Sequence, residues 1–306
     1  MASHESSPVI RSGGERGGAV DRPSNVALRF VSLEITPQCN LTCGHCYTKS
    51  SPYFHDPNVV DWLRILREAH ELGCRQVQFI GGEPTIYPKI VELLTTASDL
   101  GYEYIEIYTN LVSVPNNLLR TIGDLGVKVA TSFYSSNRDV HEQLTGVKGS
   151  FDKTVAGIRQ VLLKNIPLRV GLISIHDDEY QLQDTISFLS GLGVDKNNVG
   201  VDHLRPVGRG IGYVATENPK ERLCGNCWKG RLAISWDGIC YPCVFSRNVP
   251  VGDVLKGSLE EIVWARALQK FREEIFCDSL VKKHSFQETS SSSDFTRSLA
   301  EIVFSE

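Results

Sequence analysis

The sequence predicts an α/β fold, in which repeated strand–helix units surround a parallel sheet and a small extension of different character follows. Two observations predict it. From residue 29 to residue 204, short runs rich in β-forming residues alternate with helical stretches, and the alternation stops within 205–212. Successive strand–helix units place their strands parallel and gather ligand-binding loops at the carboxyl ends of the strands. With 306 residues, of which 41% are hydrophobic, the chain is long enough to bury a sizeable core.

Six strand-like runs define the expected sheet, and each except the last is followed by a helical stretch. Eight such units would be needed for a closed barrel. The expected strands are 29–36 (RFVSLEIT), 76–80 (QVQFI), 104–109 (YIEIYT), 127–134 (VKVATSFY), 168–175 (LRVGLISI) and 199–204 (VGVDHL). The expected helices are 59–72, 89–100, 115–125, 151–164 and 180–191.

The two ends of the chain differ in composition from the rest. Residues 1–27 are rich in Ser, Gly, Arg and Glu without periodicity, and we expect a disordered leader there. The strand–helix region is expected over 28–212 and the extension over 213–284. The remaining residues, 285–306, form a low-complexity tail, in which 298–304 (SLAEIVF) could make a short docking helix.

Composition and charge exclude several classes of protein. No apolar run approaches the roughly 18 residues that cross a bilayer, so a membrane-spanning protein is excluded. The 32 Lys and Arg against 36 Asp and Glu leave a net charge of −4 without a concentrated basic segment, which argues against a nucleic-acid partner. The N-terminus lacks the apolar core of a secretory signal, so we expect a cytoplasmic protein in which disulfides do not persist.

The nine cysteines therefore need an explanation other than disulfides, and their distribution suggests one. Thiolate ligands of one metal or cluster come in tight groups, because they must converge on a small object. The sequence thus predicts two sites, while Cys74, at a helix-to-strand junction, is expected in the core. One group is Cys39, Cys43 and Cys46, and the other is Cys224, Cys227, Cys240, Cys243 and Cys277.

The first group, Cys39-Asn-Leu-Thr-Cys43-Gly-His-Cys46, follows the first expected strand and so lies in a loop at the carboxyl edge of the sheet. Three thiolates can hold three irons of a 4Fe–4S cluster and leave the fourth iron open. The alternative is zinc, whose fourth ligand would come from His45 or a distant cysteine. The spacing of these cysteines alone slightly favours an iron–sulfur cluster over zinc.

A second motif, Gly81-Gly82-Glu83-Pro84, follows directly after the second expected strand, at the same edge of the sheet. Paired glycines let a ligand approach the backbone closely, and a glutamate accepts hydrogen bonds from an ammonium group. Alone, this motif would be an ordinary turn. The order Cys-x3-Cys-x2-Cys after one strand and Gly-Gly-Glu-Pro after the next resembles the radical S-adenosylmethionine (radical SAM) superfamily.

This resemblance covers roughly residues 29–210 and implies a partial barrel of six βα units. It implies that Cys39, Cys43 and Cys46 ligate a 4Fe–4S cluster whose open iron binds the amino and carboxylate groups of S-adenosylmethionine. Residues at the strand ends would contact this cofactor, although Thr, Asn and Ser often merely cap loops there and a His is often simply packed. The implied cofactor-binding residues are His45, Gly81, Gly82, Glu83, Pro84, Thr109, Asn110 and Ser132.

The chemistry implied by the resemblance begins with a reduction. An electron from an external donor such as flavodoxin or ferredoxin passes through the cluster and cleaves S-adenosylmethionine to methionine and a 5′-deoxyadenosyl radical. The radical takes a hydrogen atom from an unactivated C–H bond, so the protein must orient the substrate and exclude water. A non-catalytic iron–sulfur or zinc sensor or scaffold is the alternative, but it would not need the Gly-Gly-Glu-Pro turn.

The second cysteine group permits two interpretations. Its Cys-x2-Cys pairs, at 224–227 and 240–243, are close to a zinc ribbon, although the intervening segment is short for one. The stretch 219–265 also resembles the SPASM or twitch extension of radical SAM enzymes, in which a cysteine, a hairpin and a second cysteine bind an auxiliary 4Fe–4S cluster. Asp237-Gly238 is a strong hairpin-turn signal. The remaining cysteines are too few for a second auxiliary cluster.

Five cysteines compete for four ligand positions in this extension. The resemblance fits Cys227 and Cys243 best, with Cys224 and Cys277 completing the auxiliary set. Cys240 is then a spare thiol, whose weak S–H bond could return a hydrogen atom to a substrate radical. The alternatives are that Cys240 packs as a small buried residue or is itself a ligand.

We therefore expect a radical SAM enzyme that acts on a natural-product intermediate. In having a spare thiol, the chain resembles the aminoglycoside epimerases of the neomycin type. The alternative substrate is a ribosomally made peptide, which would need a separate recognition protein because the leader is too short to serve as one.

Other polar residues are candidates for substrate contacts or for a solvated helix start. The first are Asp177, Asp178, Asp202, His203, Arg205 and Arg209, and the second are Arg138 and His141.

Overall fold

The structure is a computed structural model that describes residues 26–174, 179–213 and 223–287. Its first part alternates strands with helices, as expected. The strands are β1 (Phe30–Glu34), β2 (Gln76–Ile80), β3 (Tyr104–Tyr108), β4 (Lys128–Phe133), β5 (Leu168–Ser174) and β6 (Val199–His203). The helices are α1 (Trp62–Glu71), α2 (Ile90–Asp99), α3 (Asn116–Asp124), α4 (Arg138–Thr145), α5 (Ser150–Leu163) and α6 (Glu179–Gly191).

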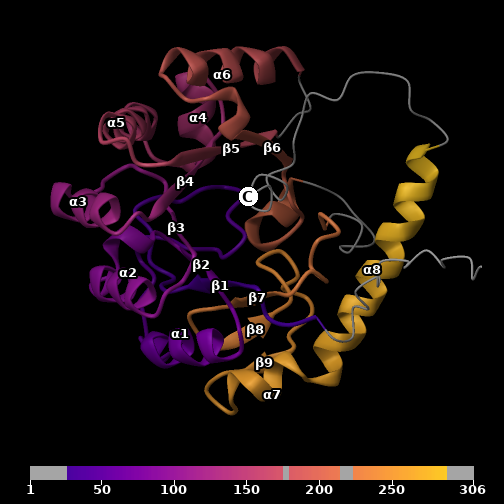
Figure 1. Cartoon of the computed structure of the whole chain (residues 1–306). Helices are drawn as coiled ribbons and strands as arrows, with labels where there is room; N and C mark the ends of the chain where they lie inside the picture. Colours follow the sequence, from indigo (N-terminus) through magenta and orange to yellow (C-terminus); the bar gives the residue numbers. More distant parts are fainter. Residues whose placement is uncertain (1–25, 175–178, 214–222, 288–306) are drawn as a thin grey trace, which may run out of the picture.

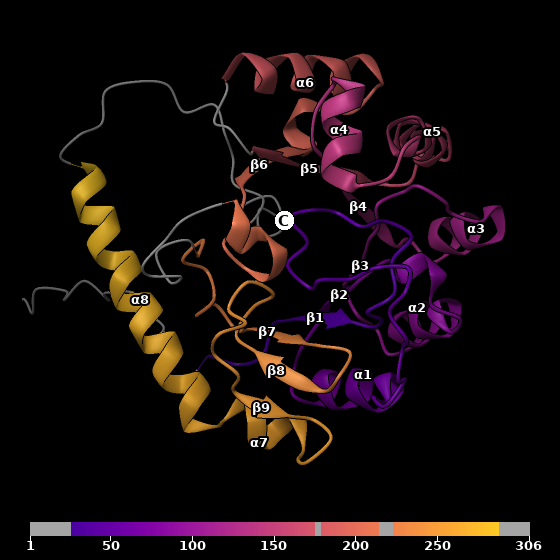
Figure 2. The ribbon, with the colours of Figure 1, turned by 180° about the vertical axis from the view of Figure 1, so that it is seen from behind.

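The extension adds three strands and two helices to this arrangement. They are β7 (Arg231–Ile234), β8 (Ile239–Tyr241), β9 (Gly252–Asp253), α7 (Leu259–Val263) and α8 (Arg266–Gln287). The described strands form one sheet in the order β6-β5-β4-β3-β2-β1-β7-β8-β9. Figures 1 and 2 show α1 to α6 around the outside of the curved sheet, with α8 on the opposite side of the molecule. The six parallel strands and their outer helices confirm the expected partial barrel.

Burial explains why these elements form where they do. All five residues of β1 are buried, as expected for a parallel strand covered on both faces. The buried side chains of α1 recur at helical spacing, so the helix presents one apolar face to the sheet. Cys74 is a member of the same hydrophobic core, as the sequence predicted. The buried residues of α1 are Trp62, Ile65, Leu66 and Ala69.

Helix α4 corrects one expectation, which placed a solvated helix start at Arg138 and His141. His141 is 1% exposed, and its ring centroid lies 4.8 Å from that of Phe133 and 5.4 Å from that of Tyr134. Burial lowers the pKa of His141 to about 4, so its ring is neutral at pH 7. Arg138 does face solvent, where it forms an ion pair with Asp152.

The extension continues the barrel sheet. Strand β7 pairs with β1 in parallel, and Arg231 lies opposite Phe30. Strands β7 and β8 then form the expected hairpin, in which Ile234 pairs with Cys240 and Gly238 has a φ of +88°. The sequence predicted this hairpin but not its attachment to the first strand. The attachment carries the extension cysteines to the edge of the barrel.

Described residues extend beyond the expected domains at both ends of the chain. Val26 belongs to the predicted leader but is buried, and its carbonyl accepts a hydrogen bond from Arg272 of α8 at 3.0 Å. Helix α8 ends at Gln287, inside the predicted tail. The docking helix predicted over 298–304 lies outside the described residues.

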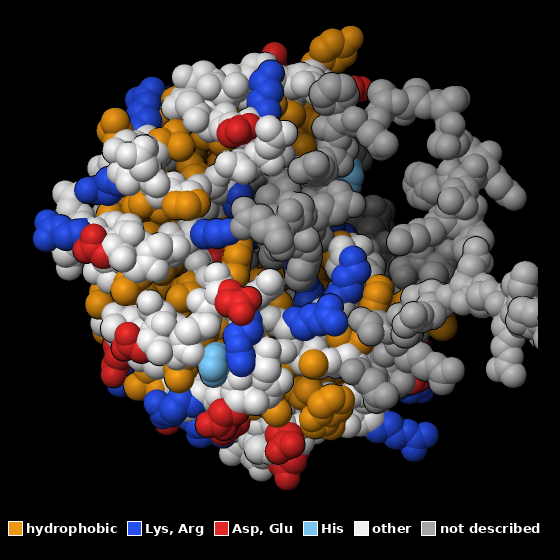
Figure 3. All heavy atoms as spheres, in the orientation of Figure 1, with side chains coloured by type: hydrophobic (Ala, Val, Ile, Leu, Met, Phe, Trp, Pro, Cys, Tyr) orange, Lys and Arg blue, Asp and Glu red, His pale blue; other side chains and the backbone are white. Residues whose placement is uncertain are grey.

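The surface carries both signs of charge. On the face shown in Figure 3, Lys and Arg side chains are interspersed with Asp and Glu side chains, in agreement with a net charge of −4. Among the helices that the structure describes, none is both long and apolar enough to cross a membrane.

A buried ion pair and the hydrogen bonds to its carboxylate join three strands inside the barrel. Glu106 of β3 is fully buried and accepts hydrogen bonds from Nε and Nη2 of Arg169 in β5, at 2.6 and 2.7 Å. Gln78 of β2 and Tyr104 of β3 donate to the same carboxylate, both at 2.6 Å. Burial alone would raise the pKa of Glu106, but Arg169 and these donors hold it below its usual value. The carboxylate is therefore charged and fully partnered.

Replacing Glu106 by Gln should strongly destabilise the protein. The amide leaves the Arg169 guanidinium buried without its counter-charge, which costs about 3–5 kcal/mol at sites of this kind. Urea unfolding measures the loss. The matched control is Asp152→Asn, which removes the exposed ion pair with Arg138 and should change stability little. Equal effects of the two substitutions would contradict the role given to Glu106.

Candidate functional site

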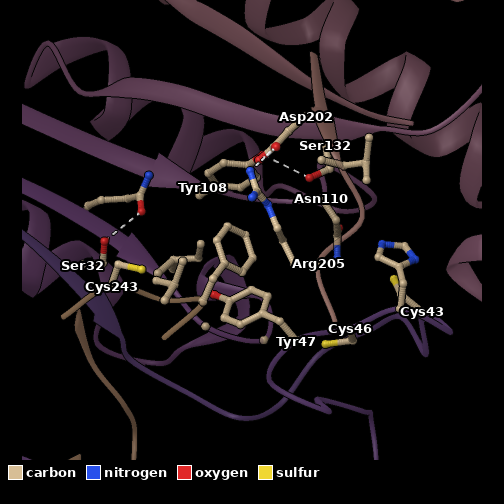
Figure 4. Close-up of a pocket in the computed structure, with 18 of the residues that line it drawn as sticks. Ser32, Cys43, Cys46, Tyr47, Tyr108, Asn110, Ser132, Asp202, Arg205 and Cys243 are labelled. Atoms are coloured by element: carbon tan, nitrogen blue, oxygen red, sulfur yellow. Dashed lines mark hydrogen bonds and ion pairs between the residues drawn. The ribbon is translucent and has the colours of Figure 1, made fainter. Parts of the chain in front are cut away.

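A cavity of about 280 Å³ opens at the carboxyl ends of the barrel strands. Its wall combines residues from the loops after the parallel strands with residues of the extension. Cys39, Cys43 and Cys46 line one part of this wall, and Cys224 and Cys243 line another. Figure 4 shows Cys46 and Cys243 on different sides of the cavity. The structure therefore brings the two cysteine groups, which the sequence treated as separate sites, to one cavity.

The loop that carries the first cysteine group is held from two sides. The backbone N–H groups of Thr42 and Gly44 donate to carbonyls at the end of α4, at 3.1 and 3.0 Å. Arg209 donates from Nε to the Cys43 carbonyl and from Nη2 to the Ser50 carbonyl, both at 2.8 Å. The sequence offered Arg209 as a carboxylate ligand or as a tie between barrel and extension. The structure instead uses its side chain to fix the cysteine loop.

The three cysteines of this loop fit a 4Fe–4S cluster. Burial raises the pKa of Cys39 and raises that of Cys43 to about 12, so each must release a proton when it binds iron. Among the described residues, no three His, Cys, Asp or Glu side chains lie close enough together to hold one metal ion. A cluster takes each thiolate on a different iron, so its ligands need not share the coordination sphere of one ion. The fit rests on three thiols from one loop that line one cavity.

Gly81 and Gly82 are required by the cysteine loop itself. Gly81 has a φ of +139°, and a Cβ at this position would lie 2.6 Å from the Thr36 carbonyl oxygen. A Cβ on Gly82 would lie 1.9 Å from the Gln38 carbonyl oxygen. Both glycines line the cavity, as expected of cofactor contacts. The close approach of a ligand was the expected reason for these glycines. That explanation was incomplete, because the chain's own backbone already leaves no room for a side chain at either position.

Glu83 ties the end of β3 to this turn. Its carboxylate is 1% exposed and accepts hydrogen bonds from the hydroxyls of Thr85 and Thr109 at 2.7 and 2.6 Å. The backbone N–H of Asn110 donates to it at 2.8 Å. Burial raises the pKa of Glu83, and these donors oppose that shift. Neither Glu83 nor Pro84 lines the cavity, so the structure does not place this carboxylate where the cofactor's amino group was expected.

The other four expected cofactor contacts do line the cavity: His45, Thr109, Asn110 and Ser132. The Asn110 side-chain amide donates to Oδ1 of Asn40 at 2.6 Å, which connects β3 to the first cysteine loop. Burial, with a smaller effect of a nearby arginine, lowers the pKa of His45 to about 4, so its ring is neutral.

The extension brings three of its cysteines together. Cys227 is buried, and its thiol donates to Cys243 Sγ at 3.2 Å. Cys224 lies exposed at the cavity wall, and its interaction with the neighbouring Cys227 lowers the pKa of its thiol. This thiolate character suits iron ligation. Cys277, the fourth predicted ligand, is exposed on α8 and does not line the cavity, so the structure does not bring it to the other three.

Cys240 lies in the main hydrophobic core and not at the cavity. Its side chain is 0% exposed and belongs to the large hydrophobic cluster that also contains the buried residues of α1. Burial raises the pKa of its thiol to about 12. A hydrogen donor must reach the substrate, so this position does not support the donor role expected of Cys240. Its surroundings fit the other interpretation, that Cys240 packs as a small buried residue.

Three of the candidate substrate contacts line the cavity, namely Asp202, His203 and Arg205. Arg205 forms an ion pair with Asp202, which Figure 4 shows at the cavity wall. Asp177 and Asp178 lie outside the described residues.

Several aromatic residues of the cavity wall were not identified from the sequence. The Tyr108 and Ser132 hydroxyls lie 3.0 Å apart, and the Tyr134 ring packs edge-on against His45 at 4.8 Å between centroids. Aromatic residues at strand ends are common in ordinary cores, so no sequence signal marked them. Tyr47, Phe245 and Arg169 also line the wall.

Gly82→Ala should disturb the first cysteine group. The added Cβ would overlap the Gln38 carbonyl, one residue before Cys39, so the loop must shift. We expect the reconstituted protein to lose most of the iron of this site, about four atoms per chain, in a colorimetric iron assay. Gly191→Ala is the matched control, because a Cβ there meets nothing within 4 Å. A full iron content in Gly82→Ala would show that the close approach does not constrain the loop.

Two family models match the sequence. Residues 33–189, just over half of the chain, match the radical SAM superfamily. Residues 224–292 match SPASM, an iron–sulfur cluster-binding domain. The two matched segments correspond to the barrel and the extension.

Named relatives share parts of the sequence. The PqqA peptide cyclase of Bradyrhizobium diazoefficiens is 30% identical over 175 residues, which cover 55% of this chain and 45% of that protein. The sporulation killing factor maturation protein SkfB of Bacillus subtilis is 24% identical over 286 residues, which cover 80% of this chain and 68% of that protein. This chain spans about half the length of the PqqA peptide cyclases that it matches.

Solved structures share the fold. Streptococcus suis SuiB bound to S-adenosylmethionine has a TM-score of 0.64 at 18% identity, covering 81% of this chain and 68% of SuiB. SuiB bound to its precursor peptide SuiA has a TM-score of 0.64 at 16% identity, covering 82% and 68%. The partial barrel seen here and the family match over more than half of the sequence agree, and the chain belongs to the radical SAM superfamily, with a SPASM domain after its barrel.

Proposed function

We propose that this chain is a radical SAM enzyme that oxidises a ribosomally made peptide, removing a hydrogen pair to form a cross-link or a double bond. The observation that carries the proposal is the shared cavity. Cys39, Cys43 and Cys46 face it from one loop, and Cys224 and Cys243 face it from the extension. A substrate in this cavity would lie between the site that starts a radical reaction and a site able to accept an electron.

A 4Fe–4S cluster on the first cysteine group would supply the electron that cleaves S-adenosylmethionine, giving a radical that takes a hydrogen atom from the substrate. The residues of the chain bind and orient the reactants. The Asn110 amide is fixed by Asn40, and His45 lines the cavity beside the cysteines. Because the His45 ring is neutral, it does not repel the positive sulfonium of the cofactor. The largely apolar wall keeps water from the radical.

The cavity favours oxidation over epimerisation. Epimerisation needs a thiol that returns a hydrogen atom to the substrate radical, and the expected donor, Cys240, is buried in the core. The described cysteines that do line the cavity all belong to the two expected cluster groups. The substrate radical would then give one electron to an auxiliary cluster on the extension cysteines. A proton leaves the substrate as the new bond forms, which completes the removal of a hydrogen pair.

The relatives support a peptide substrate. The PqqA peptide cyclase and the killing factor maturation protein are named for peptide modification, and SuiB is solved with a precursor peptide. The aminoglycoside-type epimerisation first expected finds no such support, and its donor thiol lies away from the cavity. A zinc or iron sensor would not explain the radical SAM family match. The external electron donor, such as flavodoxin or ferredoxin, stays a prediction.

Cys243→Ala should remove the auxiliary cluster. Cys243 lines the cavity and is hydrogen-bonded to Cys227. After anaerobic reconstitution we expect about four irons per chain in place of about eight. With dithionite and S-adenosylmethionine, the variant should still form 5′-deoxyadenosine, measured by mass spectrometry, but no modified substrate. Cys240→Ala is the matched control from the same hairpin and should keep both clusters. Loss of a cluster from Cys240→Ala alone would reverse the ligand assignment.

Peptide oxidation can be tested without knowing the natural substrate. Reconstituted protein is incubated anaerobically with S-adenosylmethionine, dithionite and a mixture of synthetic peptides that together contain every residue type. The expected result is a peptide lighter by a hydrogen pair, formed together with 5′-deoxyadenosine. The control is the variant with Cys39, Cys43 and Cys46 replaced by Ala, which should form neither product.

An aminoglycoside of the neomycin type, incubated in D₂O, tests the competing reaction in parallel. The proposal predicts that the aminoglycoside is unchanged. An epimer that carries a solvent deuterium, with all peptides unmodified, would overturn the proposal in favour of epimerisation.

A further inference from the structure

Five basic and aromatic side chains form a stacked row beside the cavity. The guanidinium of Arg205 lies over the Phe245 ring, 5.6 Å from its centroid, and this ring meets the Tyr47 ring edge-to-face at 5.4 Å. The guanidinium of Arg247 lies 5.3 Å from the centroids of both Tyr47 and Tyr241. Such contacts are attractive because the face of an aromatic ring is electron-rich.

The stacked row connects the two cysteine groups through their neighbours in sequence. Tyr47 directly follows Cys46, and Phe245 and Arg247 follow Cys243 closely. Figure 4 shows Tyr47 between Cys243 and Cys46. Because Phe245 and Arg247 of the extension both contact Tyr47 of the barrel, a shift of either segment would break these contacts.

Ion pairs fix the row to the ends of two strands. Arg205 pairs with Asp202 of β6, and Arg247 pairs with Glu34 of β1. Glu34 is 1% exposed, and burial raises the pKa of its carboxyl, while Arg247 opposes that shift. An unpaired buried carboxylate would be costly, so Glu34 strongly restricts where the Arg247 guanidinium can lie.

We propose that the stacked row, with Arg247 as its key positioning residue, sets the distance and orientation between the two cysteine groups across the cavity. Arg247 does not line the cavity and acts through Tyr47. Arginine suits this position because its planar guanidinium can stack on two rings while its N–H groups pair with a carboxylate. The inference rests on the proposed function in taking both cysteine groups to hold clusters, and its yield measurement also takes a peptide as the substrate.

Two double variants separate this role from a general loss of stability. Glu34→Gln with Arg247→Met removes the buried pair without leaving an unpaired charge. Asp152→Asn with Arg138→Met removes an exposed pair that does not line the cavity and is the matched control. If the first variant fails to fold, Arg247→Lys, which keeps the charge but not the planar stacking, replaces it.

Hydrogen–deuterium exchange in the metal-free proteins gives the first measurement. The segment 243–249 is followed by mass spectrometry, because its Ser246 and Val249 amides donate to carbonyls within the segment. We expect about tenfold faster exchange there in the variant that lacks the Arg247 pair, since its anchoring contacts are lost. The control should exchange like the unmodified protein.

Electron paramagnetic resonance of the reduced, reconstituted proteins gives the second measurement. Two nearby reduced clusters interact magnetically, which broadens their signals and speeds their relaxation. We expect the Arg247 variant, at full iron content, to show an altered interaction. Its yield of modified peptide per 5′-deoxyadenosine should fall by roughly 10- to 100-fold, the effect of a small misplacement of reacting groups.

The two measurements decide the proposal together. Unchanged exchange in 243–249, or an unchanged magnetic interaction in the fully loaded variant, would overturn it. The proposal is supported if the unmodified protein shows two interacting clusters and the variant shows both faster exchange in 243–249 and an altered magnetic interaction. If the unmodified protein shows no second cluster, the proposed function fails in its auxiliary site, and the exchange measurement alone still decides whether the row fixes the segment.

Discussion

The close backbone approach between the turn after β2 and the loop after β1 is the constraint on which the site depends. The N–H groups of Gly82 and Glu83 donate to the carbonyls of Thr36 and Gln38, both at 2.7 Å. This contact fixes the chain one residue before Cys39, and it is possible only because no Cβ intervenes. The Glu83 carboxylate then extends the constraint to the end of β3. The residues that line the cofactor side of the cavity are thus positioned by hydrogen bonds of the chain itself.

Strand pairing places the extension where it can take part in the same cavity. Because β7 adds to β1 in parallel, the extension starts beside the strand that leads to the first cysteine loop. The segment after β8 then returns to the barrel, where Arg247 pairs with Glu34 and stacks on Tyr47. A radical site and an electron-accepting site must lie within reach of one substrate, and a continuous sheet holds them in a fixed relation. This continuity links the fold to the proposed oxidation.

Local patterns predicted the barrel well, because each strand and helix carries its own periodicity, and the spacing of Cys39, Cys43 and Cys46 predicted the first site. Contacts between distant segments could not be read in this way. His141 looked solvated because the rings that bury it come from β4 and α5. Cys240 was expected to be a hydrogen donor because the resemblance leaves it as the spare fifth thiol, but alternate residues of a strand face opposite sides of the sheet, and Cys240 faces the core. The hydrogen bonds of Glu83 to Thr109 and Asn110 could not be read from its own motif, because those residues follow β3.

The central claim is that two iron–sulfur clusters face one cavity. Anomalous diffraction at the iron and zinc absorption edges, from crystals of the anaerobically reconstituted protein, tests it most directly. The account predicts two separate iron peaks, one beside Cys46 and one beside Cys243, on opposite parts of the same cavity wall. A zinc signal beside Cys243, or a second iron peak remote from the cavity, would contradict it.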